Sequence, residues 1–206
     1  MKRVTTILAA AAGFSLIAAG AAQAQSLGGF PIREPGSSAG SGSPGTSPGQ
    51  KGPLQIIVDA NGPGPYTTIS KAVAAVGEGG VVYVMHGVYN ESVTLSKSIF
   101  IQGDRGPGSG VEINAPMNQP CLKFAPASGT AHAVVANVSF IAKPNSRSSA
   151  CVDIGAGVFT LKESDVLGST VMPAVRISGG TVMLEKNRIS AGSEGVYVEQ
   201  NHTLSQ

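Results

Sequence analysis

Four polar side chains occupy the same position of a short segment that recurs along the second half of the chain. The segments are Cys121–Phe124, Cys151–Ile154, Ala174–Ile177 and Gly195–Val198, and their third residues are Lys123, Asp153, Arg176 and Tyr197. If the segments are stacked strands, these four side chains form a row on one outward sheet face. A carboxylate beside two cations can bind a substrate, abstract a proton or attack an ester. All four are therefore candidate substrate-binding residues, and the first three are candidate catalytic residues.

The alternative interpretation of this row, which the sequence favours, is a solvated sheet face. Charges of alternating sign avoid like-charge stacking and form modest cross-strand pairs. A calcium site would need several oxygen ligands, whereas the row holds a single aspartate. Three further aligned pairs fit the same surface pairing: Lys162 with Glu185, Glu163 with Lys186, and Asp165 with Arg188.

Histidine spacing gives no indication of a metal centre. The three histidines, His86, His132 and His202, lack the spacing of metal ligands, and each is expected in a turn or on the surface. The glycine-rich stretch around Gly103 follows a strand and opens no helix, so it does not predict a phosphate-binding loop. We expect neither a metal nor a cofactor.

Two cysteines, Cys121 and Cys151, occupy the first position of consecutive segments. Neighbouring parallel strands hold such residues at a distance that a disulfide can span. Ala174 and Gly195 fill the same position in the later segments, so two small buried thiols are equally consistent with the pattern. The sequence leaves both alternatives open, and a bonded pair would be structural rather than catalytic.

A repeat in the sequence identifies the elements that must position these residues. The segments start 30, 23 and 21 residues apart, and a second apolar set repeats in step: Val135, Leu161 and Leu184, each followed five residues later by Phe140, Val166 and Ile189. Short strands repeating every 20–25 residues or so with Gly-rich corners are typical of a solenoid. We predict an all-β, right-handed parallel β-helix over residues 54–206, with a β-sandwich as the alternative. Its inward columns would be Leu122, Val152, Val175 and Val196, and Phe124, Ile154, Ile177 and Val198.

The start of this domain has a different pattern. After an apolar strand at residues 54–58, Tyr66 to Val76 places apolar residues at helical spacing, which predicts a short capping helix. Thr67 or Thr68 could cap its N-terminus, and Gly77 would end it. A second apolar strand and a His86-Gly87 turn follow.

This part of the chain resembles the N-terminal part of pectin methylesterases and other pectin-lyase-like β-helix proteins. The resemblance covers about residues 55–104 and rests on the stretch IIVDANGPGPYTTISKAVAAVGEGGVVYVMHGVYNESVTLSKSIFIQGD. It implies a β-helix whose end is plugged by the amphipathic helix. The family's turn usually reads Pro-Gly-x-Tyr-x-Glu, and here His86 replaces the proline. The esterase's catalytic motifs are absent from this chain, so no catalytic residue can be transferred.

The first 24 residues are typical of a secretory signal peptide. Lys2 and Arg3 precede an apolar run that ends in Ala22-Gln23-Ala24, which favours cleavage after Ala24. An uncleaved membrane anchor is the alternative. Residues 25–53 are rich in Gly, Ser and Pro and predict a flexible linker. We therefore expect a periplasmic or secreted protein with no membrane span after signal cleavage.

Composition excludes some partners. Outside the leader, twelve Lys and Arg residues balance twelve Asp and Glu residues, so the basic footprint of a nucleic-acid-binding protein is missing. These observations favour a non-catalytic module of the cell envelope that binds or scaffolds polysaccharide. The alternative is a polysaccharide lyase or carbohydrate esterase of the pectin-lyase-like class.

The C-terminal end of the predicted β-helix carries no evident cap. A strand beginning at Thr203-Leu204 is the last predicted element, and an uncovered coil leaves strand edges unpaired. The sequence favours truncation of a longer product, and the alternative is self-association through the open end.

Overall fold

The computed structural model describes residues 52–105 and 110–199, which belong to one compact unit. The predicted leader, all but two residues of the predicted linker, and the strand predicted at Thr203-Leu204 lie outside the described residues. Within the described residues, all strand pairings are parallel and one helix is present. No helix there is long and apolar enough to cross a membrane.

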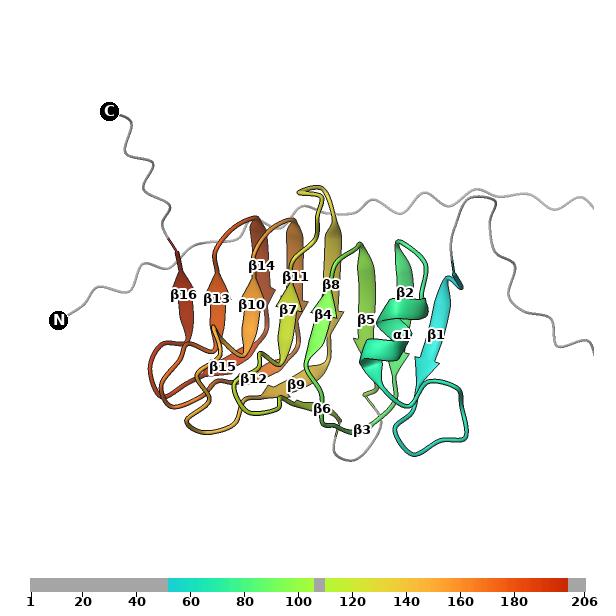
Figure 1. Cartoon of the computed structure of the whole chain (residues 1–206), viewed down its shortest axis with the longest axis horizontal. Helices are drawn as coiled ribbons and strands as arrows, with labels where there is room; N and C mark the ends of the chain where they lie inside the picture. The colour runs from blue at the N-terminus through green and yellow to red at the C-terminus, as the bar shows by residue number, and fades with distance from the viewer. Residues whose placement is uncertain (1–51, 106–109, 200–206) are drawn as a thin grey trace, which may run out of the picture. The chain divides into compact units, whose positions relative to one another are not determined.

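The strands form three parallel sheets that the chain visits in turn (Figure 1). Sheet A holds six strands: β1 Gln55–Val58, β2 Gly80–Val84, β5 Ile99–Gly103, β8 His132–Ala136, β11 Val158–Lys162 and β14 Thr181–Glu185. Sheet B holds five: β3 Gly87–Tyr89, β6 Val111–Asn114, β9 Val138–Ile141, β12 Asp165–Leu167 and β15 Arg188–Ser190. Sheet C holds five: β4 Val93–Leu95, β7 Leu122–Phe124, β10 Val152–Ile154, β13 Val175–Ile177 and β16 Val196–Val198. The β-helix prediction is confirmed and the β-sandwich alternative is wrong; the right-handed sense stays a prediction.

The register of sheet C is the one that the repeat predicted. Asp153 of β10 lies between Lys123 of β7 and Arg176 of β13, and Arg176 in turn pairs with Tyr197 of β16. The predicted columns in the other two sheets are also in register. Because strand side chains alternate between faces, this register puts every second residue into one continuous apolar core.

The core is packed by the inward columns. Phe124 and Phe159 bring residues of sheets C and A together, with ring centroids 5.4 Å apart, and both are fully buried. Full burial of such side chains stabilises the fold by about 1.5–3 kcal/mol each. The Gly-rich corners let successive coils approach: Gly180 has φ +83°, and an added Cβ would lie 2.3 Å from the carbonyl oxygen of Gly157.

Helix α1 (Ile69–Ala75) lies beside β1 and β2 at one end of the stack (Figure 1). The helix is shorter than the predicted segment Tyr66 to Val76, and its buried residues are Ile69, Ala72 and Val73. The predicted side-chain cap is wrong: Thr68 is the N-cap residue but makes no side-chain hydrogen bond. The Glu91 carboxylate, from the β3–β4 turn, accepts hydrogen bonds from the amides of Ile69 and Ser70 at 2.8 and 2.9 Å. A carboxylate satisfies these free amides as well as a local cap would.

The opposite end of the described coils exposes inward-column residues. Val196 and Val198 of β16 are 42% and 58% exposed, whereas Val175, one strand earlier, is fully buried. Of the described residues, no strand pairs with the outer edges of β14, β15 and β16. Self-association through this end stays a prediction.

Candidate functional site

The structure brings all four residues of the predicted row together on the outer face of sheet C. Lys123, Asp153, Arg176 and Tyr197 lie on four consecutive strands. Neighbouring strands are about 4.8 Å apart, so the row spans roughly 15 Å. The alternation of buried and outward residues is clearest in β7, where Lys123 is exposed between buried Leu122 and Phe124.

Both carboxylate oxygens of Asp153 already accept a hydrogen bond from a neighbouring side chain. Its Oδ2 accepts a hydrogen bond from the Ser149 hydroxyl at 2.7 Å, and its Oδ1 accepts one from Arg176 Nη1 at 3.1 Å. The residue is only 8% exposed. A general base or nucleophile must reach a substrate, and both oxygens of this carboxylate are already engaged.

Arg176 is the centre of the ion-pair network on this face. Its Nη2 lies 2.5 Å from Glu199 Oε2, in addition to the bond from Nη1 to Asp153. Burial disfavours the guanidinium charge, but the hydrogen bonds and charges of the two carboxylates outweigh it and raise the pKa of Arg176 above its usual value. The guanidinium is therefore held in place by two acidic partners.

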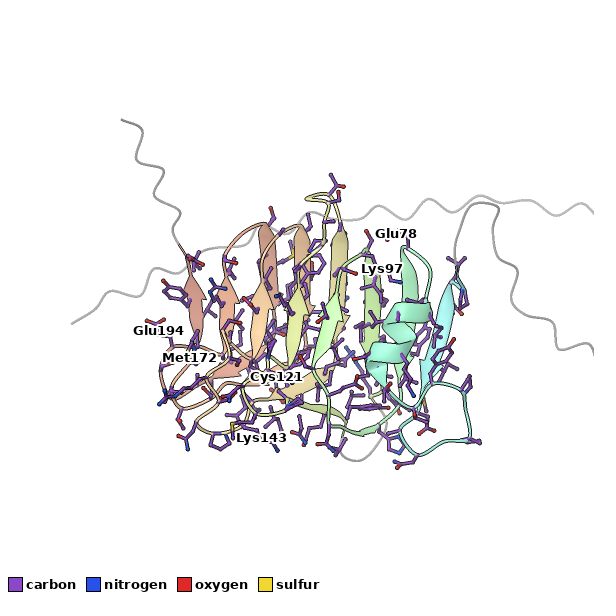
Figure 2. All side chains as sticks on the ribbon, in the orientation of Figure 1. Glu78, Lys97, Cys121, Lys143, Met172 and Glu194 are labelled. Atoms are coloured by element: carbon purple, nitrogen blue, oxygen red, sulfur yellow. A yellow bond between two sulfur atoms is a disulfide. The ribbon has the colours of Figure 1, made fainter. Side chains whose placement is uncertain are left out.

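A cavity of about 440 Å³ opens beside this network. It is lined by Ser149, Met172, Pro173, Arg176, Glu194 and Tyr197. Tyr197 is 42% exposed and supplies an aromatic surface. Figure 2 shows Met172 and Glu194 together at the end of the stack that holds β16. An aromatic ring with a polar tip, placed among carboxylate and guanidinium groups, can bind a hydroxyl-rich ligand by packing and hydrogen bonds.

Sequence reasoning identified Arg176 and Tyr197 but missed the other four lining residues. These four lie directly before the strands of sheet C, in loops whose lengths differ from coil to coil. The sequence feature that could have identified them is their position, since each comes one to three residues before a strand of sheet C or its repeated segment. Because the loops do not repeat, alignment of the coils could not indicate their side-chain contacts.

Lys123 stands apart from the network. It is exposed and lies beside Asp153 in register. Among the described residues, no side chain forms an ion pair with it. The three candidate catalytic residues are therefore neighbours, but Asp153 is bound to Arg176 and Ser149 rather than to Lys123.

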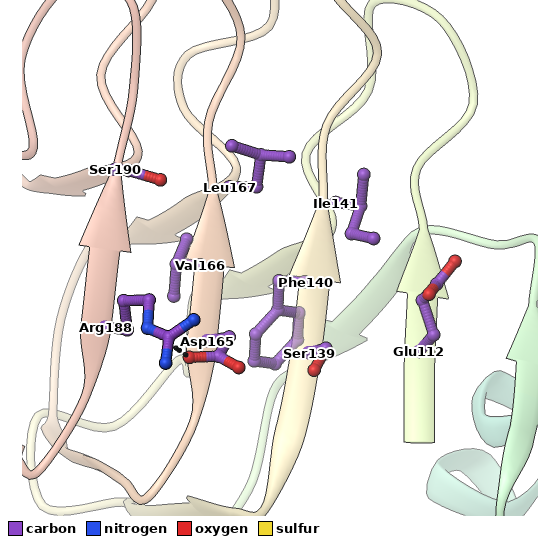
Figure 3. Close-up of a pocket in the computed structure, with 9 residues that line it drawn as sticks. All are labelled: Glu112, Ser139, Phe140, Ile141, Asp165, Val166, Leu167, Arg188 and Ser190. Carbon is purple, nitrogen blue, oxygen red and sulfur yellow. Dashed lines mark ion pairs between the residues drawn. The ribbon is translucent and has the colours of Figure 1, made fainter. Parts of the chain in front are cut away.

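A second hollow, of about 290 Å³, lies on the outer face of sheet B (Figure 3). Register places Glu112, Ser139, Asp165 and Arg188 in one row there. Arg188 Nε lies 3.8 Å from Asp165 Oδ1, and these side chains are 86% and 57% exposed. An ion pair this exposed contributes little. The only ring lining the hollow, Phe140, is fully buried, so this face offers less to a ligand than the cavity on sheet C.

One predicted charge pair has a different partner. Glu163 does not pair with Lys186 but with the guanidinium of Arg105, which also donates a hydrogen bond from Nε to Asn137 Oδ1 at 2.8 Å. Glu163 and Lys186 both adopt positive φ, 50° and 53°, at equivalent corners between sheets A and B. The corner geometry sets the direction of the side chains, and strand alignment alone does not reveal it.

Cys121 and Cys151 form a disulfide with a Cα–Cα distance of 4.9 Å. Of the two alternatives that the sequence left open, the structure has the bonded one. Both residues are buried, and the bond joins adjacent coils at the loops that enter β7 and β10. The disulfide therefore cross-links two coils of sheet C, the sheet that carries the row of Lys123, Asp153, Arg176 and Tyr197.

No metal-binding cluster is present within residues 52–105 and 110–199, where no three His, Cys, Asp or Glu side chains are grouped to hold an ion. His86 Nδ1 lies 3.4 Å from Asp104 Oδ2, at the exposed end of sheet A. His202 lies outside the described residues. The candidate site is accordingly built from the hydrogen-bonding groups and the ring on sheet C.

No protein-family model matches this chain, and no curated protein sequence matches it. The parallel β-helix is established by the structure, and membership of the pectin-lyase-like superfamily stays a prediction.

Proposed function

We propose that this chain is a non-catalytic polysaccharide-binding module of an exported protein, and that it binds its glycan in the cavity on sheet C. The observation that carries the proposal is the contrast between two residues of the row, Asp153 and Tyr197. Asp153 is buried with both oxygens engaged, whereas Tyr197 presents its ring beside an open cavity. Such an arrangement favours binding over proton transfer.

Tyr197 is the residue on which the proposal can be tested. Tyr197→Ala should weaken binding to a retained polysaccharide by about threefold to tenfold, the effect of losing one aromatic contact. Tyr83→Ala is a matched control, because Tyr83 is similarly exposed, at 40%, on β2 of sheet A. Affinity electrophoresis in gels containing neutral and acidic plant or bacterial polysaccharides measures both variants. Equal retention of both variants and the wild type in every gel would refute binding at this cavity.

A polysaccharide lyase or carbohydrate esterase is the second candidate. It is favoured by Lys123, which lies beside Asp153 in register and has no ion-pair partner among residues 52–105 and 110–199. The assay is release of unsaturated sugars or methanol from the same polymers. Turnover that Asp153→Asn abolishes, in a variant with unchanged melting temperature, would replace the binding proposal with this one.

Export is the third part of the proposal. A buried structural disulfide forms in oxidising compartments, and cytosolic proteins rarely keep one. The Cys121–Cys151 bond therefore supports the periplasmic or secreted location that the leader predicts. Cell fractionation, with thiol alkylation before and after reduction, tests it: protein found in the cytosol with two free thiols would contradict export.

A further inference from the structure

The charges around the cavity on sheet C indicate which class of glycan it accepts. We infer that this cavity selects uncharged polysaccharide and rejects polyuronides, and that Glu194 is the residue that sets this selectivity. The inference rests on the proposed function, since it concerns the ligand of the same site.

The first step is that Arg176 cannot serve as a free cation for an acidic ligand. Its Nη1 and Nη2 already donate to Asp153 and Glu199, at 3.1 and 2.5 Å. An arginine that recognises a ligand carboxylate commonly pairs two of its nitrogens with it. A uronate that paired with Nη1 and Nη2 of Arg176 would have to displace the buried Asp153 carboxylate and the part-exposed Glu199 carboxylate, which would lose their ion-pair partner.

The second step is the charge of Glu194. It lines the cavity, is exposed, and forms no ion pair with any residue in the described part of the chain. Its main-chain oxygen accepts a hydrogen bond from the Ala174 amide at 2.9 Å, which fixes this loop against the one before β13. The lining residues and the two ion-pair partners of Arg176 together therefore carry one positive charge, on Arg176, and three negative charges, on Asp153, Glu199 and Glu194.

The third step is that the nearest unpaired cation in the row is too far away to compensate. Lys123 is two strands from Arg176, which is about 10 Å at the usual strand spacing, and it does not line the cavity. The remaining lining atoms belong to Met172, Pro173, Ser149 and the Tyr197 ring. These groups suit the C–H faces and hydroxyl groups of a neutral sugar, whose hydroxyls can donate to the carboxylates.

The experiment compares two polymers that share a backbone and differ in charge: polygalacturonate and highly methyl-esterified pectin, with hydroxyethylcellulose and laminarin as further neutral probes. The wild-type protein should bind at least one neutral polymer and should bind polygalacturonate more weakly than its methyl ester. Added NaCl should strengthen polygalacturonate binding, because salt screens a repulsion between charges.

Glu194→Gln should raise the ratio of the affinity for polygalacturonate to that for methyl-esterified pectin about sixfold, the effect of one like charge at roughly 8 Å through an effective dielectric constant of about 40. Glu185→Gln is the control, because Glu185 is an exposed carboxylate on β14 of sheet A, and it should leave the ratio unchanged. Melting temperatures of both variants check that they fold.

The outcomes separate the two claims. Stronger wild-type binding to polygalacturonate than to its methyl ester, or an unchanged ratio in Glu194→Gln, would overturn the selectivity while leaving polysaccharide binding intact. Binding that Tyr197→Ala does not weaken for any polymer, or no binding to any of the four probes, would overturn the proposed function and the selectivity with it.

Discussion

The disulfide between Cys121 and Cys151 should be the largest single contribution to the stability of sheet C. The two cysteines are 30 residues apart in the chain. Closing a loop of that length removes about 3.6 kcal/mol of chain entropy from the unfolded state at 25 °C. Both residues are fully buried or nearly so, at 0% and 1% exposed, and alanine, which fills the same place in the next coil at Ala174, should be tolerated sterically.

The Cys121→Ala/Cys151→Ala variant should therefore lose about 3–4 kcal/mol of unfolding free energy and roughly 7–14 °C of melting temperature. Urea unfolding followed by circular dichroism measures the first, and calorimetry the second. The matched control is the reductant: dithiothreitol should lower the stability of the wild-type protein during unfolding but should not affect the double variant.

A loss below about 1 kcal/mol in the double variant would refute this reasoning, because it would mean that the unfolded chain gains little freedom when the bond is absent. Equal sensitivity of both proteins to reductant would contradict it as well, since the double variant has no bond to reduce.

Four further predictions concern the cap on helix α1, a glycine corner, a buried tyrosine and the exposed end of the described coils. Glu91→Ala should destabilise the fold by about 1–2 kcal/mol in urea unfolding, because the amides at the start of α1 lose their acceptor. Glu91→Gln should recover part of this stability, since its amide oxygen can still accept. Equal stability of the two variants would contradict the prediction. Gly180→Ala should destabilise by about 2 kcal/mol or more, from positive φ and the clash with Gly157, while Gly64→Ala, with nothing within 4 Å, should be close to neutral. Burial raises the pKa of the Tyr89 hydroxyl above its ordinary 10.0. The protonated hydroxyl therefore contributes stability that is fully present below pH 10, and this contribution should be lost as the pH rises through the raised pKa. Tyr89→Phe should remove this alkaline component of a stability–pH curve, and an unchanged curve would refute the assignment. If the exposed end around Val198 pairs with a second copy, light scattering should give a dimer mass that Val198→Lys reduces to a monomer, whereas a monomeric wild type excludes such pairing.

Strand register could be predicted from sequence because a β-helix repeats its alternation from coil to coil. The columns through Val152 and Ile154 were identified by matching short apolar segments, and one outward polar residue between them fixed the orientation of each strand. A one-residue slip would have reversed every side chain of the strand, so few registers were compatible with the pattern. The same logic placed Asp153 and Arg176 side by side.

The contacts that make the candidate site depend on segments that do not repeat. Ser149 and Glu194 come from loops of different lengths, and Glu199 follows the last described strand, so no periodic signal connected them to Arg176. The cap on α1 comes from Glu91, some 22 residues after the amides that it binds. Long-range side-chain contacts of this kind are set by how loops fold over a finished core.

By itself, the sequence determined the solenoid, its inward columns, the amphipathic plug and the neighbours in the outward row, because each follows from local alternation repeated at a regular period. Only the tertiary structure decided that Asp153 is engaged on both oxygens, that Arg176 is neutralised by two carboxylates, and that Tyr197 borders a cavity. The physical reason is that hydrogen bonds and charge pairs act over a few ångströms between residues far apart in the chain, so they exist only once the coils have stacked and the loops have been placed.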